Sequence, residues 1–195
     1  MGTKQFIQIP RKFLDLDAGT KFIDILVYSI IDFQKDSLTH KSRIGVRTIA
    51  EKYNITLVKV EESIKRLKDN GFIDYVHLPS EKYTNFVFNE YTLPNYKNNY
   101  LMLKHEILTL PLKAKERGVL IYLQLIAIHG LNDIYETNIE DIAIRLKISR
   151  QTMSKYLKMF IQMNLIHKSK NGIYSCQYLF KDSQDNKLRN TTIIL

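Results

Sequence analysis

The feature that most constrains the fold of this chain is a repeat that spans nearly half of its 195 residues. Small and apolar residues of the first half recur 93 positions later, in the same order and without a gap. The matched positions are Ile49 with Ile142, Ala50 with Ala143, Ile55 with Ile148, Thr56 with Ser149, Val60 with Met153, Ile64 with Leu157, Leu67 with Phe160, Phe72 with Leu165 and Ile73 with Ile166. Further upstream the offset is 94, since Leu16 matches Leu110 and Tyr28 matches Tyr122. Solenoid repeats run about 20–50 residues, so a period of this length predicts two tandem domains.

Each unit has the pattern of a short strand, an apolar helix, two amphipathic helices joined by a tight turn, and a pair of strands. In the first unit these segments are residues 6–10, 22–31, 46–53, 57–70, 72–78 and 86–91, with a polar loop at 35–42 and a hairpin loop at 79–85. Gly71 follows the last helix, where glycine can adopt the positive φ that ends a helix. The pattern predicts an α+β protein that is mainly helical, with small β wings.

A polar segment that begins with a proline separates the two units. We therefore expect a first domain at residues 1–94, a linker at 95–99, a second domain at 100–181 and a C-terminal tail at 182–195. The tail ends in the apolar run 191–195. That run is expected either to close the second domain as a strand or to dock on a partner copy of the chain.

The helix pair of the second unit carries the clearest candidate site. Lys147, Ile148 and Ser149 form a turn, and the Ser149 hydroxyl is placed to cap the next helix. Helical periodicity turns Met153, Leu157, Phe160 and Ile161 inward. It turns an opposite, donor-rich face outward: Arg150, Gln151, Ser154, Lys155 and Lys158. Such side chains reach base edges and phosphates in the DNA major groove, so we interpret this unit as a helix-turn-helix followed by a wing.

The charge distribution agrees with this interpretation. Lys and Arg exceed Asp and Glu by 29 to 20, for a net charge of +9, and residues 96–195 account for +7 of it. No acidic residue occurs between Asp141 and Asp182, whereas eight basic residues do. A solvated helix face normally mixes both signs of charge. A basic stretch of one sign, centred on a helix-turn-helix, favours nucleic acid as the partner.

The repeated strand, helix, helix-turn-helix and wing resemble tandem winged-helix proteins of the plasmid and phage replication-initiator type. The resemblance lies in residues 6–16 with 21–28, repeated as 100–110 with 115–122, and in the two helix pairs. It implies that the second helix of each pair enters the major groove and that the wing contacts the DNA backbone. By position, the implied DNA-binding residues are Arg150, Gln151, Thr152, Ser154, Lys155 and Lys158 of the helix, and Lys168, Lys170 and Asn171 of the wing.

The first unit departs from that pattern on its groove-facing helix. Leu57, Val58, Glu61 and Glu62 stand where the second unit has Arg150, Gln151, Ser154 and Lys155. Because carboxylates repel phosphates, we expect the first domain to serve in dimerisation or in docking a replication or regulatory protein. Residues that remain candidates for contacts to the DNA backbone are Lys59, Lys65, Arg66, Lys82 and Tyr156.

Signals for other chemistry are missing from the sequence. Cys176 is the only cysteine, the five histidines are scattered, and there is no phosphate-binding glycine loop. Adjacent carboxylates such as Glu61 and Glu62 have no nucleophile or orienting partner. We therefore expect no enzymatic activity, no metal and no cofactor. The sequence also lacks a signal peptide and an apolar run long enough to cross a membrane, so we expect a cytoplasmic protein.

These observations predict sequence-specific binding of double-stranded DNA, and the resemblance implies a role in the initiation of plasmid or phage replication. Two alternatives stay open. One is a transcription regulator with the same mode of DNA binding. The other is a winged-helix adaptor of the kind that supports chromosome-segregation complexes. A homodimer is expected in the DNA-binding readings, because single modules bind weakly and two-fold symmetry is common among such proteins.

Overall fold

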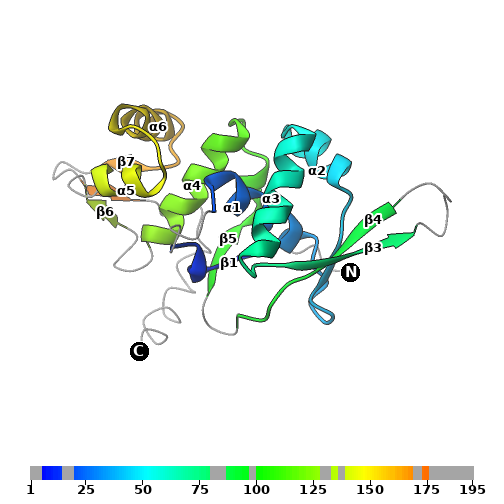
Figure 1. Ribbon diagram of the computed structural model, residues 1–195. Helices are drawn as coiled ribbons and strands as arrows, with labels where there is room; N and C mark the ends of the chain where they lie inside the picture. Colours follow the sequence, from blue (N-terminus) through cyan, green and yellow to red (C-terminus); the bar gives the residue numbers. More distant parts are fainter. Residues whose placement is uncertain are drawn as a thin grey trace.

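The computed structural model describes residues 6–14, 20–79, 87–96, 100–127, 133–135, 139–168 and 173–175. The protein is mixed α+β (Figure 1). Elements of the first half are β1 (Phe6–Pro10), η1 (Arg11–Leu14), α1 (Phe22–Phe33), β2 (Lys41–Arg43), α2 (Val46–Tyr53), α3 (Leu57–Asp69), β3 (Asp74–Pro79) and β4 (Val87–Thr92). Elements of the second half are β5 (Tyr100–Lys104), η3 (His105–Leu108), α4 (Ala114–Ala127), β6 (Asp133–Tyr135), α5 (Ile139–Arg145), α6 (Arg150–Gln162), β7 (His167–Lys168) and β8 (Ile173–Ser175).

The repeat predicted from the sequence is confirmed in the order of the elements. Each half has a three-stranded antiparallel sheet, in the order β2-β4-β3 in the first half and β6-β8-β7 in the second. Helices α2 and α3 begin 93 residues before α5 and α6, respectively. None of the helices in the described ranges has the length and apolar character needed to cross a membrane.

Backbone geometry repeats at the same offset. In the turn between the paired helices, the Ile55 N–H donates to the Ala50 carbonyl at 2.9 Å, and the Ile148 N–H donates to the Ala143 carbonyl at 3.0 Å. In this turn Asn54 and Lys147 both lie in the left-handed region, with φ of 53° and 52°. After the second helix, Gly71 has φ of 66° and Asn164 has φ of 56°. The chain-reversing positions therefore coincide, although only one of the four residues is glycine.

Lys147 is the least suited of these residues to its conformation. Asn and Gly tolerate the left-handed region, whereas a long side chain there costs about 1–2 kcal/mol. The side chain of Lys147 is exposed. Because the side chain points to solvent, it does not clash with neighbouring side chains. The hydrogen bond from the Ile148 N–H to the Ala143 carbonyl stabilises the turn in this conformation.

The short strand β2 corrects the prediction of a polar loop at 35–42. Strand β2 pairs with β4, and Glu90 of β4 is buried between two cations of β2. Lys41 Nζ and Arg43 Nε lie 2.7 Å from the two carboxylate oxygens of Glu90 and hold its pKa below the usual value. Cross-strand ion pairs of this kind stabilise a strand that has no apolar alternation, and for that reason hydrophobic periodicity missed it.

The two halves join through their first strands and their central helices. Strand β1 pairs with β5 in antiparallel fashion, and Gln8 faces Met102, its counterpart at an offset of 94. The flanking pairs are reciprocal. At the same offset, Tyr100 is the counterpart of Phe6 and Lys104 is the counterpart of Pro10, and in the sheet Phe6 faces Lys104 while Pro10 faces Tyr100. A strand that pairs with its own repeat in this way defines a local two-fold axis between the halves. Helices α1 and α4 lie beside one another at the centre of Figure 1, with α3 and α6 on opposite sides of them.

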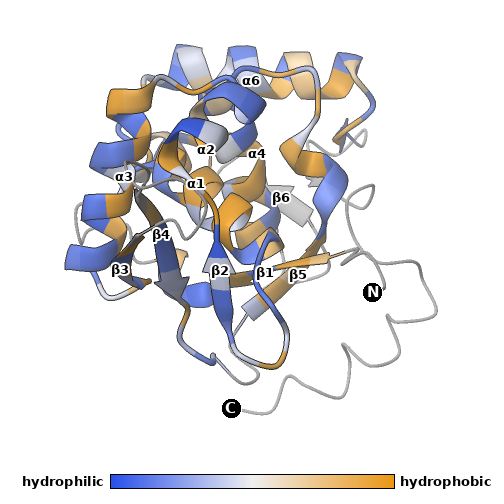
Figure 2. Ribbon diagram, turned by 90° about the vertical axis from the view of Figure 1, so that its right-hand side faces the viewer, coloured by the Kyte–Doolittle hydropathy of each residue, from blue (hydrophilic) through white to orange (hydrophobic). Residues whose placement is uncertain are grey.

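Close approach of α1 and α4 depends on Gly118. A Cβ atom built on Gly118 would lie 2.1 Å from the carbonyl oxygen of Phe22, at the start of α1. Next to it, the guanidinium of Arg117 is buried and donates to the carbonyls of Tyr53, in the first half, and Leu108, in the second. Figure 2 shows that α1 and α4, the central helices, are rich in apolar residues, and most of these are buried.

We predict that Gly118→Ala destabilises the protein by about 2–3 kcal/mol, because the added methyl group overpacks the α1–α4 contact. Helix propensity alone would favour alanine by about 1 kcal/mol, so the sign of the change separates packing from propensity. Urea unfolding followed by circular dichroism measures the difference. In Gly45→Ala the new Cβ would lie 3.4 Å from Thr48 Oγ1, so this control should cost less than about 1 kcal/mol. A stabilised Gly118→Ala variant would contradict the close contact.

Candidate nucleic-acid interface

Helix α6 is fixed at its start by the side chain predicted to cap it. Ser149 has extended backbone angles, and its Oγ accepts a hydrogen bond from the backbone N–H of Thr152 at 3.1 Å. The Oγ atom also lies 2.8 Å from Thr152 Oγ1. This cap satisfies a donor that the helix cannot pair internally, and it makes Arg150 the first helical residue.

Three of the four residues predicted to face inward are buried. Met153, Leu157 and Phe160 pack into the core, whereas Ile161 is only half-buried. The ring of Tyr156 stacks against Phe160 with the centroids 6.3 Å apart. These contacts fix the rotation of α6, so its opposite face points to solvent.

That opposite face brings together the side chains that the sequence placed on it. Arg150, Gln151, Lys155 and Lys158 are exposed, and Ser154 and Thr152 are half-buried. All of these except Thr152, with Met159 and Gln162, line a shallow hollow of about 680 Å³ along the helix. The hollow contains three cations and no carboxylate, so its chemistry suits a polyanion with hydrogen-bonding groups.

Two neighbouring residues modify this face. Arg150 Nη1 lies 3.6 Å from Glu140 Oε2, and both side chains are about two-thirds exposed, so the ion pair is weak and readily exchanged for a phosphate or a base. Burial raises the pKa of Tyr156, and the charge of Glu116 raises it further. Both effects favour the neutral form of Tyr156, whose hydroxyl can donate a hydrogen bond.

The predicted wing is described only in part. Lys168 is exposed in the short strand β7. Lys170 and Asn171 lie outside the described residues, as do Lys82 in the first half and the C-terminal tail.

The equivalent face of α3 has a different character. Leu57 and Val58 are 41% and 61% exposed, and Glu61 and Glu62 are exposed beside them. Thr56 occupies the N-cap position of α3, and its hydroxyl makes no capping hydrogen bond. Lys59 and Lys65 are exposed on the same helix.

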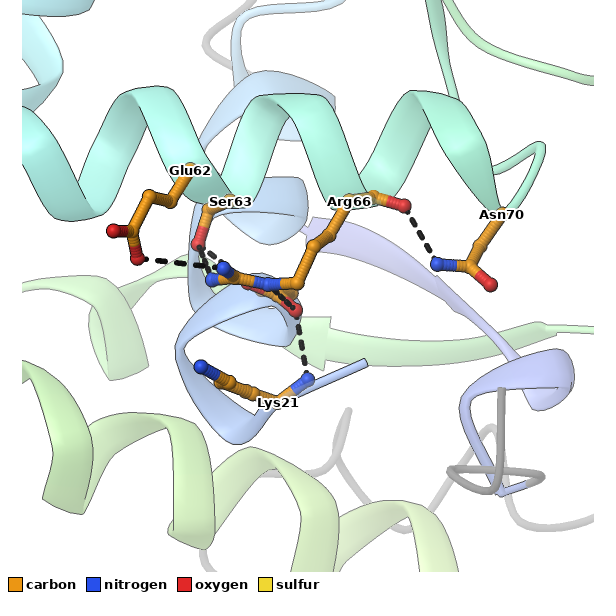
Figure 3. Close-up of polar contacts among 6 residues, drawn as sticks. Lys21, Glu62, Ser63, Arg66 and Asn70 are labelled. Carbon is orange, nitrogen blue, oxygen red and sulfur yellow. Dashed lines mark hydrogen bonds and ion pairs between the residues drawn. The ribbon is translucent and has the colours of Figure 1, made fainter. Parts of the chain in front are cut away.

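Arg66, a candidate for a contact to the DNA backbone, is held against α1 by an acidic partner (Figure 3). The fully buried Asp24 of α1 accepts from Arg66 Nε at 2.9 Å and from Arg66 Nη2 at 2.8 Å. It also accepts from the Ser63 hydroxyl at 2.5 Å and from the Lys21 backbone N–H at 2.7 Å. The remaining Nη1 lies 3.4 Å from Glu62, and these carboxylates raise the pKa of Arg66.

The Asp24 cluster connects the start of α1 to α3, and the sequence analysis missed it. Its signal was an aspartate in the first turn of a mostly apolar helix, because a carboxylate needs a partner when it is buried. The sequence offered several cations for that role, and only the packing of α3 on α1 selects Arg66. With its guanidinium engaged in this way, the half-buried Arg66 lies at the edge of the α1–α3 contact and its charge is already paired.

The described part of the chain contains no group of three or more His, Cys, Asp or Glu side chains that could hold a metal ion. No protein-family model matches the chain, and no significant match is found among curated proteins. The functional assignment therefore depends on the geometry and charge of the surface itself.

We predict that Ser149→Ala lowers the free energy of unfolding by about 1 kcal/mol, because α6 loses its side-chain cap. Thermal unfolding measures the loss. The matched control is Thr56→Ala at the same position of the first half, where no capping bond exists, and it should cost less than about 0.5 kcal/mol. Equal losses at both positions would show that the Ser149 hydrogen bond does not stabilise the helix.

Proposed function

We propose that this protein binds double-stranded DNA in a sequence-specific manner through α6. The observation that carries the proposal is a row of donor side chains on one side of a capped, well-packed helix: the exposed Arg150, Gln151, Lys155 and Lys158, with the half-buried Ser154. A helix is narrow enough to enter the major groove, and its N-terminal residues reach the base edges first. Three cations without a carboxylate along this row supply the attraction to phosphate.

We further propose that the two halves are tandem winged-helix domains. Support comes from the repeated order of helix, strand, helix, tight turn, helix and two antiparallel strands. In each half the strands that follow the second helix form a hairpin, which takes the place of a wing. The repeated hydrogen bond and positive φ in the tight turn support a helix-turn-helix in both halves.

The roles of individual residues follow from their positions on α6. Arg150, Gln151 and Ser154, on the first turns, are proposed to contact base edges. Lys155 and Lys158 are proposed to contact phosphates and so to set the orientation of the helix. Thr152, whose hydroxyl lies against the cap, and Tyr156 are placed to support these contacts. Lys168, Lys170 and Asn171 are assigned to the DNA backbone on the resemblance alone.

The proposed biological role is the initiation of plasmid or phage replication, and regulation of transcription would use the same mode of binding. In both roles the first half would act by dimerisation or by docking another protein, because the exposed side chains of α3 include carboxylates and apolar groups. The exposed Leu57 and Val58 are also the specific observation that favours the second candidate function, an adaptor in a chromosome-segregation type complex.

We expect the affinity for random duplexes of about 20 bp to fall steeply between roughly 50 and 200 mM salt, because bound cations release counterions from DNA. Fluorescence anisotropy measures it. Replacing both Lys155 and Lys158 with alanine should weaken binding on all sequences and reduce the slope against log salt by about 2. Glu61→Ala is the control and should not weaken DNA binding by α6. Absent or salt-independent binding by the wild type would refute the proposal and favour the adaptor.

A separate measurement addresses sequence readout, on a target site selected from a random DNA pool. If Arg150 contacts a guanine, Arg150→Ala should cost roughly 1–3 kcal/mol on the selected site and relax the preference at one base position. The same variant should bind random duplexes only slightly less well. A uniform loss on every sequence would instead assign Arg150 to phosphate.

A further inference from the structure

The outward faces of α3 and α6 occupy equivalent positions and carry opposite charge. Five positions on each helix define them, and we call these sets the α3 face and the α6 face. The α3 face consists of Leu57, Val58, Glu61, Glu62 and Lys65, with a net charge of −1. The α6 face consists of the residues 93 positions later, Arg150, Gln151, Ser154, Lys155 and Lys158, with a net charge of +3.

The α3 face also carries exposed apolar side chains. Leu57 and Val58 are 41% and 61% exposed on the α3 face. In the second half, Ile144 is 67% exposed on α5, the helix that precedes α6, and its counterpart in the first half is the exposed Glu51 of α2. The α3 face is therefore acidic and apolar, whereas the α6 face is basic. Exposed apolar residues rimmed by charge are typical of a surface that contacts another protein.

Charges on both faces remain available to a partner. Glu62 lies 3.4 Å from Arg66, whose guanidinium is already held by Asp24, and the Glu62 side chain is 55% exposed. Arg150 lies 3.6 Å from Glu140 at a similarly exposed site. Such exposed pairs contribute little, so a partner of opposite charge can replace them.

We propose that two copies of this chain associate with the α3 face of each copy against the α6 face of the other. The occupant is identified by charge: the α3 face carries two exposed carboxylates that complement the three cations of the α6 face. A dimer with two-fold symmetry makes this contact twice, because the symmetry that places one α3 face on an α6 face also places the reverse pair. The dimer is closed, and both DNA-binding faces are covered.

One consequence rests on the proposed function. If the α6 face binds DNA, self-association and DNA binding exclude each other, and duplex DNA converts the dimer into a protein–DNA complex with uncovered α6 faces. In the dimer, the carboxylates on α3 of one copy then compete with DNA phosphates for the cations on α6 of the other copy. Their presence at the groove-facing positions of the first half thus has a physical explanation.

Charge reversal provides the test, with sedimentation velocity over a protein concentration series at a fixed ionic strength of about 0.1 M. One variant carries Glu61→Lys with Glu62→Lys, and the other carries Lys155→Glu with Lys158→Glu. All four side chains are exposed, so both variants should fold. In each variant alone the two faces have charges of the same sign, and the dimer dissociation constant should rise at least about tenfold.

An equimolar mixture of the two variants should restore the dimer. In the mixed pair both contacts join faces of opposite sign, whereas neither variant can pair with itself. Lys59→Glu, which lies on α3 but outside the α3 face, is the matched control and should change the dissociation constant by less than about twofold. The proposal fails if the wild type stays monomeric, if either variant alone dimerises as well as the wild type, or if the mixture stays monomeric.

The same variants separate this proposal from the proposed function. The variant with Glu61→Lys and Glu62→Lys retains its α6 face and should bind duplex DNA at least as tightly as the wild type. DNA binding by a wild type that remains monomeric would overturn the dimer and retain the DNA-binding function. A dimer that follows the charge-reversal pattern without any DNA binding would overturn the function and retain the dimer.

Discussion

Antiparallel pairing of β1 with β5 is the constraint on which the rest of this structure depends. The strands are copies of one another, and their register sets Gln8 opposite its own counterpart Met102. This pairing satisfies edges that each half would otherwise expose, and it brings the equivalent helices α1 and α4 into contact. A local two-fold axis follows, so the chain has the internal symmetry of a homodimer within one polypeptide.

The contact around that axis is tight and contains a charge. Gly118 leaves room for the carbonyl of Phe22, and the buried Arg117 connects the halves through the carbonyls of Tyr53 and Leu108. Burial lowers the pKa of Arg117, and among the described residues no carboxylate pairs with it to offset the cost of removing its charge from water. Carbonyl oxygens at the end of α2 and in η3 take that role. The halves are thereby joined by directional bonds as well as by apolar packing.

On this symmetric scaffold the side chains have diverged where the backbone has not. Helices α3 and α6 begin and end at equivalent residues and are followed by the same turn, yet one presents carboxylates and apolar groups and the other presents cations. The two helix pairs therefore share one backbone geometry and differ in the chemistry of their five outward positions. In the first half the buried Asp24 holds Arg66 at the surface boundary, which removes one more cation from α3 and makes the contrast with α6 greater.

The sequence by itself determined whatever depends on neighbours along the chain. The cap at Ser149, the positive φ of Gly71, the inward face of α6 and the repeat of the helix pair are local, since helix periodicity and turn chemistry act over a few residues. Only the tertiary structure decided what depends on residues far apart. It paired β1 with β5, made a strand of Lys41–Arg43 around Glu90, and assigned Arg66 to Asp24. Each of these contacts joins groups more than 40 positions apart, where pattern and propensity carry no information about which partner is near.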